Sequence, residues 1–228
     1  MDKETIIAVD GPAGAGKSTV SRELAKRLGY VYIDTGAMYR AITLKALRKK
    51  IDVKDEEPLI KLAAAADLTF VYDENQQDAP NRIYMDGEDV SEEIRTAKVS
   101  RCVSFVSAVS GVRKILTGKQ RVLAQNGYVV MDGRDIGTTV LPRAGLKIYL
   151  TASLEERTKR RYEELTKKGQ EANYEEVKKD LAWRDQFDSS REHSPLAQAD
   201  DAVFVDTTDM TISEVVEKMA ELHRGVAL

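Results

Sequence analysis

Short apolar runs alternate with longer amphipathic stretches along most of this chain. Five runs are rich in valine, isoleucine and leucine: Ile6–Val9, Tyr30–Ile33, Tyr128–Met131, Leu146–Leu150 and Ala202–Val205. Continuous apolar runs of this length are typical of parallel strands buried on both faces. Helices are expected between or after them, including residues 17–28, 37–49 and 211–224. The pattern therefore predicts an α/β fold with a five-stranded parallel sheet flanked by helices.

Two regions break this alternation. Leu68–Tyr72 and Arg82–Met85 are strand-like, and a polar loop at residues 75–81 lies between them, which predicts an inserted antiparallel hairpin. Residues 153–173 are rich in charged side chains and contain Lys167-Lys168-Gly169, which predicts a charged helix with a break.

Composition narrows the class of protein. The 228 residues are 42% hydrophobic and 32% charged, with a net charge of −3, as in an ordinary globular protein. Acidic and basic residues are interspersed, so bulk charge gives no support for nucleic-acid binding. A single cysteine, Cys102, fits a reducing cytoplasm, and the first apolar run is too short for a signal peptide or a membrane span. We expect a soluble cytoplasmic protein without a nucleic-acid or membrane partner.

A phosphate-binding loop follows the first predicted strand. Residues 11–18, Gly11-Pro12-Ala13-Gly14-Ala15-Gly16-Lys17-Ser18, match G-x-x-x-x-G-K-[ST] at every fixed position. Glycines let backbone N–H groups approach phosphate oxygens, and the following helix adds its positive N-terminal end. We expect residues 11–18, Thr19 and, near the last strand, Asp206 to contact ATP. Lys17 would reach the β- and γ-phosphates, and the Ser18 hydroxyl would ligate Mg²⁺.

The remaining charged residues indicate what the nucleotide is used for. The guanine-reading N-K-x-D element of GTPases is absent from the sequence. Arginines instead follow the predicted strands, start the charged segment, or lie in a late helix or at its end: Arg40, Arg134, Arg157, Arg160, Arg161, Arg184 and Arg191. Arginines are needed where two polyanions meet, and no histidine lies near the phosphate loop, Arg40 or Arg134 to act as a general base. Because an ionised phosphate oxygen needs no base, the pattern favours transfer to a phosphate acceptor over transfer to an alcohol.

Two aspartates are candidates for organising Mg²⁺, directly or through water. Asp132 ends one predicted strand and Asp34 ends another. Either carboxylate suits the metal, and either residue could instead cap a helix or a turn. The sequence leaves the choice between them open.

Several longer motifs are much more specific than the phosphate loop. Asp34-Thr35-Gly36-Ala37-Met38-Tyr39-Arg40, Gly87-Glu88-Asp89-Val90 and Asp132-Gly133-Arg134-Asp135-Ile136-Gly137-Thr138 are three of them. With these motifs and the hairpin insert, the chain resembles the bacterial cytidylate kinases of the nucleoside monophosphate kinase group over essentially its whole length. The resemblance implies a single P-loop kinase domain over residues 1–228. Within it we expect a monophosphate-binding lobe at 36–115, with the insert at about 67–98, and a short lid at 153–173.

The resemblance also implies a reaction and a set of site residues. MgATP would phosphorylate CMP or dCMP, giving ADP and CDP or dCDP. The implied catalytic residues are Lys17, Asp132, Arg134, Arg157 and Arg161. The implied CMP contacts are Arg40, Arg134 and Arg191 at the phosphate, Ser104, Arg113 and Asp135 at cytosine, Arg184 and Asp188 at the pentose, and Thr35 beside the phosphate or sugar.

Two alternatives remain at this point. The acceptor could be UMP, AMP or a non-nucleotide such as shikimate, or the chain could be a nucleotide-binding module without turnover. We expect a monomer with small-molecule substrates.

Overall fold

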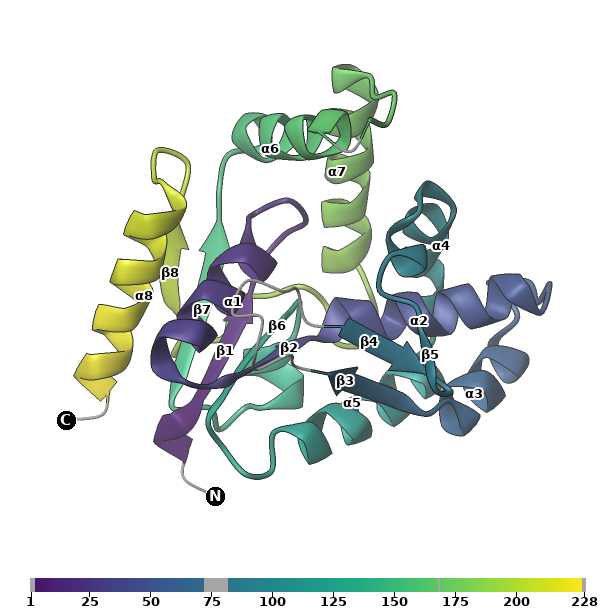
Figure 1. Ribbon diagram of the computed structural model, residues 1–228, viewed down its shortest axis with the longest axis horizontal. Coiled ribbons are helices and arrows are strands. Elements are labelled where there is room, and N and C mark those ends of the chain that lie inside the picture. The colour runs from purple at the N-terminus through teal and green to yellow at the C-terminus, as the bar shows by residue number, and fades with distance from the viewer. Residues whose placement is uncertain (1–2, 72–81, 168, 227–228) are drawn as a thin grey trace. The chain divides into compact units, whose positions relative to one another are not determined.

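The computed structural model describes residues 3–71, 82–167 and 169–226. It divides into two compact units, one formed by Met1–Val31 with Asn126–Leu228 and the other by Tyr32–Gln125. Figure 1 shows the course of the chain. Each unit is described by itself below.

The first unit contains the phosphate loop and most of a five-stranded parallel sheet. Its strands are β1 (Ile6–Asp10), β6 (Val129–Gly133), β7 (Leu146–Thr151) and β8 (Val203–Asp206), and β2 (Val31–Asp34) leads into the second unit. The sheet order is β2-β6-β1-β7-β8. β1 pairs in parallel with both β6 and β7, so it occupies the centre of the sheet. All five residues of β1 are buried, which is why this strand reads as a continuous apolar run.

The predicted strands are confirmed, with small shifts at their ends. β6 begins at Val129 and not at Tyr128, because Tyr128 has a φ of 52°, outside the extended region that a strand requires. The Tyr128 carbonyl accepts the N–H of Val31 at 2.8 Å, where β2 begins.

Four α-helices accompany this sheet: α1 (Lys17–Leu28), α6 (Leu154–Lys167), α7 (Tyr174–Ser189) and α8 (Ile212–Val226). α1 has the predicted bounds and ends at Gly29, whose φ of 68° suits a glycine C-cap. α1 packs against α8, and α6 packs against α7 (Figure 1). The charged helix expected within residues 153–173 is α6, and the expected break separates it from α7, which begins at Tyr174.

The second unit combines four helices with a small antiparallel sheet. Its helices are α2 (Thr35–Arg48), α3 (Glu56–Ala65), α4 (Ala97–Ala108) and α5 (Ser110–Leu123), and its strands are β3 (Leu68–Val71), β4 (Arg82–Met85) and β5 (Glu88–Asp89). The antiparallel pairing of β3 with β4 confirms the predicted hairpin, whose loop at 75–81 lies outside the described residues. β5 was not expected from the sequence, because two exposed acidic residues carry no apolar alternation.

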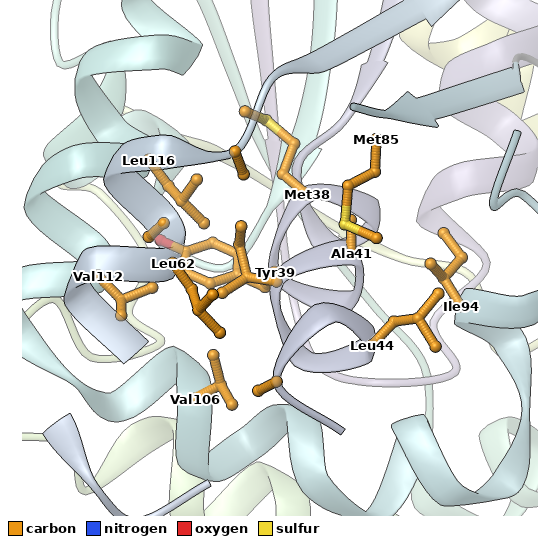
Figure 2. Close-up of a cluster of buried hydrophobic side chains, with 14 of the residues drawn as sticks. Met38, Tyr39, Ala41, Leu44, Leu62, Met85, Ile94, Val106, Val112 and Leu116 are labelled. Atoms are coloured by element: carbon orange, nitrogen blue, oxygen red, sulfur yellow. The ribbon is translucent and has the colours of Figure 1, made fainter. Parts of the chain in front are cut away.

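A hydrophobic core holds the second unit together. Figure 2 shows its buried side chains converging from α2, α3, α4, α5 and β4. Met38, Ala41 and Ile42 of α2 are completely buried, as are Val112 and Leu116 of α5. Burial of this kind is worth about 1.5–3 kcal/mol for each large apolar side chain. The core fixes the helices on which several predicted acceptor-binding residues lie.

Replacing Leu116 with alanine is expected to destabilise the protein by about 2–5 kcal/mol, because the fully buried side chain leaves a cavity that its neighbours cannot fill. Leu123 lies in the same helix but is 38% exposed, so Leu123→Ala serves as the matched control, with an expected change of about 0.5 kcal/mol or less. Urea unfolding followed by circular dichroism measures both. Equal losses from the two variants would contradict the core assignment.

Candidate active site

The phosphate loop occupies residues 11–16, between the end of β1 and the start of α1. Gly11 has a φ of 148°, and a Cβ atom at this position would lie 1.9 Å from the carbonyl oxygen of Leu150 in β7. Only glycine fits there without moving the neighbouring strand. Gly16 is the N-cap of α1, so the helix directs its first backbone N–H groups and its positive end toward the loop. This is the geometry of an anion-binding site.

Lys17 is a buried cation at the start of α1. Lys17 is only 6% exposed, and its Nζ donates a hydrogen bond of 2.7 Å to the carbonyl of Pro12. Burial, together with the positive charge of Arg134, lowers the pKa of Lys17 to about 7. A buried ammonium group held against the loop is stabilised when polyanionic phosphate arrives.

Ser18 and Asp132 place two oxygen atoms together beside this lysine. The Ser18 hydroxyl donates to Asp132 Oδ2 at 3.1 Å, although the residues are 114 positions apart. Asp132 lies near the end of β6 and is 4% exposed. Mg²⁺ in nucleotide sites takes one or two protein oxygens, with phosphates and water completing its octahedron. The pair therefore fits Mg²⁺ delivered with a nucleotide.

Asp34, the other candidate for the metal, has local partners. Its Oδ1 accepts the N–H of Ala37 at 2.9 Å, so Asp34 is the N-cap of α2 and the helix begins at Thr35, earlier than the sequence indicated. Its Oδ2 accepts from Arg95 at 3.3 Å. Of the two aspartates, Asp132 is the one that lies beside the Ser18 hydroxyl.

Arg157 and Asp185 both form hydrogen bonds with the phosphate loop at Ala13. The Arg157 guanidinium donates to the Ala13 carbonyl at 3.0 Å and to Asp185 Oδ2 at 2.6 Å. The other oxygen of Asp185 accepts the N–H of Ala13 at 3.3 Å. Arg157 also donates from Nε to the carbonyl of Ala152 at 2.9 Å. In this conformation Arg157 contacts the backbone of the loop, and its expected catalytic role stays a prediction.

The next two arginines of α6 have different surroundings. Arg160 donates to the hydroxyl of Thr207 at 3.0 Å and to its carbonyl at 2.6 Å, which ties α6 to the loop after β8. Arg161 pairs with Glu164 at 2.6 Å on the exposed side of the same helix. Asp206, the predicted ATP contact after β8, accepts from the N–H and the hydroxyl of Thr208, which hold the pKa of its carboxyl below the ordinary value.

A second arginine cluster lies after β6 and at the end of α7. Arg134 donates from Nε to Asp188 Oδ2 at 2.9 Å. Arg191 donates from Nε to the Asp188 carbonyl at 3.2 Å, and its Nη1 lies 3.8 Å from Asp188 Oδ1. Arg184 also lies in α7. Burial, and to a smaller extent the positive charge of Arg161, lowers the pKa of Arg184. The structure thus joins Arg134, Asp188 and Arg191, three of the predicted acceptor contacts, in one charged cluster.

The second unit holds four of the predicted acceptor contacts, whereas Asp135, which is buried, belongs to the first unit. Thr35, Ser104 and Arg113 are all buried. Arg113 in α5 donates to the carbonyl of Ser107 in α4 at 3.0 Å, so the end of α4 and the start of α5 bring Arg113 toward Ser104. Arg40 in α2 donates to the Ile94 carbonyl at 3.2 Å and to the Ser100 hydroxyl at 2.8 Å.

Two acidic residues of the first unit were overlooked as candidates in the sequence. Asp185, which accepts the N–H of Ala13, is one of them. Asp10 accepts the N–H groups of Ile136 and Gly137, both at 2.7 Å. Burial raises the pKa of Asp10 to about 6 despite these hydrogen bonds, which lower it. The sequence carried one signal for Asp10, a carboxylate ending an otherwise apolar run directly before the phosphate loop.

Comparison with known proteins agrees with this geometry. Residues 7–224 match the family described as cytidylate kinase. The chain belongs to the cytidylate kinase family. It is 55% identical over 218 residues to a cytidylate kinase of Caldanaerobacter subterraneus subsp. tengcongensis, covering 96% of this chain and 94% of that one. It is 53% identical over 224 residues to a cytidylate kinase of Bacillus licheniformis, covering 97% of each.

Among solved structures, an uncharacterized protein from Eubacterium ventriosum has a TM-score of 0.52 at 11% identity, covering 96% of this chain and 98% of that one. At this identity the likeness supports the fold alone. Membership of the cytidylate kinase family makes the chain an ATP-dependent nucleoside monophosphate kinase, a phosphotransferase. Within the described residues, no helix combines the length and apolar character needed to cross a membrane.

Proposed function

We propose that this member of the cytidylate kinase family transfers the γ-phosphoryl group of MgATP to CMP or dCMP. The observation that carries the proposal is the similarity to curated cytidylate kinases over nearly the whole chain. The phosphate loop with Lys17, Ser18 and Asp132 supports the donor side of the reaction. The cluster of Arg134, Asp188 and Arg191 supports a phosphate-bearing acceptor.

The reaction is an in-line displacement at phosphorus. A phosphate oxygen of CMP attacks the γ-phosphorus of ATP, a new P–O bond forms, and the bond from the γ-phosphorus to the bridging oxygen breaks as ADP leaves with that oxygen. The attacking oxygen is already ionised, so no residue has to remove a proton. The main task of the protein is to position two polyanions and offset their repulsion.

On the donor side, Lys17 holds the β- and γ-phosphates and offsets the charge that develops on the bridging oxygen. Residues 11–19 surround the same phosphates, and their backbone N–H groups are the donors except at Pro12, which has no N–H. Arg157 and Asp185 keep Ala13 in place, and Arg161 and Asp206 are the remaining proposed ATP contacts. Mg²⁺ bound with ATP would neutralise phosphate charge, with Ser18 as its hydroxyl ligand and Asp132 as the acid that organises it directly or through water.

On the acceptor side, the roles come from the family resemblance and from hydrogen-bond chemistry. Arg40, Arg134 and Arg191 hold the phosphate, which carries about −1.5 to −2 charge. Arg184 and Asp188 contact the pentose, and Thr35 lies beside the phosphate or the sugar. Ser104, Arg113 and Asp135 read cytosine, which offers an exocyclic amine donor beside its N3 and O2 acceptors. Uracil presents a carbonyl in place of the amine, so a buried acceptor would face another acceptor.

The other properties predicted from the sequence also stay part of the proposal. They are a monomeric cytoplasmic enzyme that acts only on small molecules, a monophosphate-binding lobe over 36–115 with its insert at about 67–98, and a lid over 153–173. The single cysteine supports the cytoplasmic location.

Acceptor specificity is tested by measuring ADP release with CMP, dCMP, UMP, AMP and shikimate in turn. CMP or dCMP should give the highest kcat/KM, by about 10²-fold or more over UMP, because uracil leaves buried polar groups mismatched. ADP release should depend on the acceptor, since a nucleotide-binding module without turnover would release none. Equal use of UMP or AMP would refute the cytosine assignment.

A further inference from the structure

Two of the residues proposed to contact the acceptor directly precede a π-helical turn. Arg134 and Asp135 follow β6 directly, and Ile136–Val140 form the turn after them. The carbonyl of Asp135 accepts from the N–H groups of Thr139 and Val140, at 2.8 and 3.1 Å. The direction of the Asp135 side chain, which is 4% exposed, therefore depends on how the turn is held.

The first N–H groups of any helix lack acceptors within the helix itself. Here they belong to Ile136 and Gly137, and the two oxygens of Asp10 accept one each at 2.7 Å. Asp10, the last residue of β1, thus caps this turn although it lies 126 positions before Ile136 in the chain. A carboxylate suits the task because it can accept two bonds at once, and bonds to a charged acceptor are short and strong.

Asp10 also lies next to the donor site. It is the last residue of β1, Gly11 follows it, and the charge of Lys17 acts on it. A buried negative charge beside a triphosphate site disfavours binding of the donor. We therefore expect the Asp10 carboxylate to serve a purpose other than donor binding. Asp10 and the turn also pack closely, since a Cβ atom on Gly137 would lie 3.3 Å from Asp10 Oδ2 and 3.2 Å from Lys147 Cδ.

We propose that Asp10 is a positioning residue for acceptor recognition, which holds the Arg134–Gly137 turn in register with the phosphate loop. The proposal rests on the proposed function, because it assumes that Arg134 and Asp135 contact CMP. Asp10 itself touches neither substrate. Through it, the strand that presents the donor loop also fixes the residues that read the acceptor.

Asp10→Asn is the direct test. Asparagine has the same shape but only one side-chain acceptor, so one of the two turn N–H groups loses its partner. We expect kcat/KM for CMP to fall by about 10–100-fold and the preference for CMP over UMP to fall by about tenfold, because small displacements of substrate-positioning groups are costly. The KM for ATP should stay within about threefold of wild type, since the loop residues are unchanged.

A second readout separates positioning from general destabilisation. Hydrogen exchange should speed up in the segment 134–141 of Asp10→Asn while α1 keeps its protection, because only the turn loses its cap. Glu214→Ala is the matched control, since the Glu214 side chain accepts the N–H of Thr211 at 2.8 Å beside the start of α8. This control should leave both kinetic constants and exchange in 134–141 unchanged.

Gly137→Ala probes the same contact without removing the carboxylate. It is expected to reproduce the selective loss for CMP, and it decides the matter if Asp10→Asn does not fold. If Asp10→Asn folds and its kinetics with CMP stay near the wild-type values, the inference is overturned. If Asp10→Asn does not fold, near wild-type kinetics with CMP in Gly137→Ala overturn it. An equal rise in the KM for ATP and CMP would also overturn it. A wild-type enzyme that does not use CMP would instead refute the proposed function, before any variant is examined.

Discussion

Replacing Lys17 with methionine is expected to lower kcat for phosphoryl transfer from ATP to CMP by about 10²–10³-fold, the usual cost of removing one preorganised charge-stabilising donor. The ammonium group is already desolvated and held against the Pro12 carbonyl at 2.7 Å. It therefore meets developing negative charge without first having to shed water. Steady-state kinetics with saturating ATP and CMP measures the loss.

The same substitution should leave the fold intact. Burial lowers the pKa of Lys17 to about 7, which means that the surroundings disfavour its charged form, and methionine has a similar length without a charge to bury. The melting temperature is therefore expected to be unchanged or higher. Lys26→Met, at an exposed position of the same helix, is the matched control and should keep full activity. A Lys17→Met variant that retains more than about a tenth of the wild-type kcat would contradict the role assigned to this residue.

Arg134→Ala should produce the second large effect, a fall in kcat/KM for CMP of about 10²–10³-fold with the KM for ATP within about threefold of wild type. Its guanidinium is oriented by Asp188 at 2.9 Å, so it can meet the acceptor phosphate without reorganising. Arg143 is exposed and lies nine positions further along the chain, so Arg143→Ala should leave both constants unchanged. A parallel loss of ATP affinity would place Arg134 on the donor side.

A double-mutant cycle shows whether Arg134 and Asp188 act as one unit. Asp188→Ala should weaken use of CMP and dCMP with ATP binding nearly intact, because it removes both a proposed pentose contact and the partner of Arg134. The double variant should then be much less impaired than the sum of the two single effects predicts. Simple additivity would mean that the 2.9 Å contact has no part in acceptor binding.

Part of the fold could be predicted because its signals are local. The apolar run Ile6–Val9 in β1 is continuous because this strand is buried, and Gly29 ends α1 because its backbone adopts a positive φ. The phosphate loop is equally local, because its glycines and Lys17-Ser18 stand at fixed spacings directly after the first apolar run. By contrast, β5 escaped prediction because two acidic residues pair with β4 without any apolar pattern.

Part of the candidate site could likewise be predicted from the sequence, and part could not. Its residue types follow from the chemistry of phosphate, so Lys17, Ser18 and the arginines stand out in the sequence. Two points that the sequence leaves open depend on tertiary contacts. Arg157 lies between Ala13 and Asp185, and Asp34 caps α2 while Asp132 lies beside Ser18.

The sequence by itself determined the α/β class and the donor loop and favoured a phosphate acceptor, because periodicity, backbone sterics and residue charge can be read along the chain. Only the tertiary structure decided which charged groups work together. Asp132 meets Ser18 across 114 positions, Asp10 meets Ile136 across 126, and Asp185 meets Ala13 across 172. These contacts depend on which strands and helices pack side by side, and no local pattern in the chain records that choice.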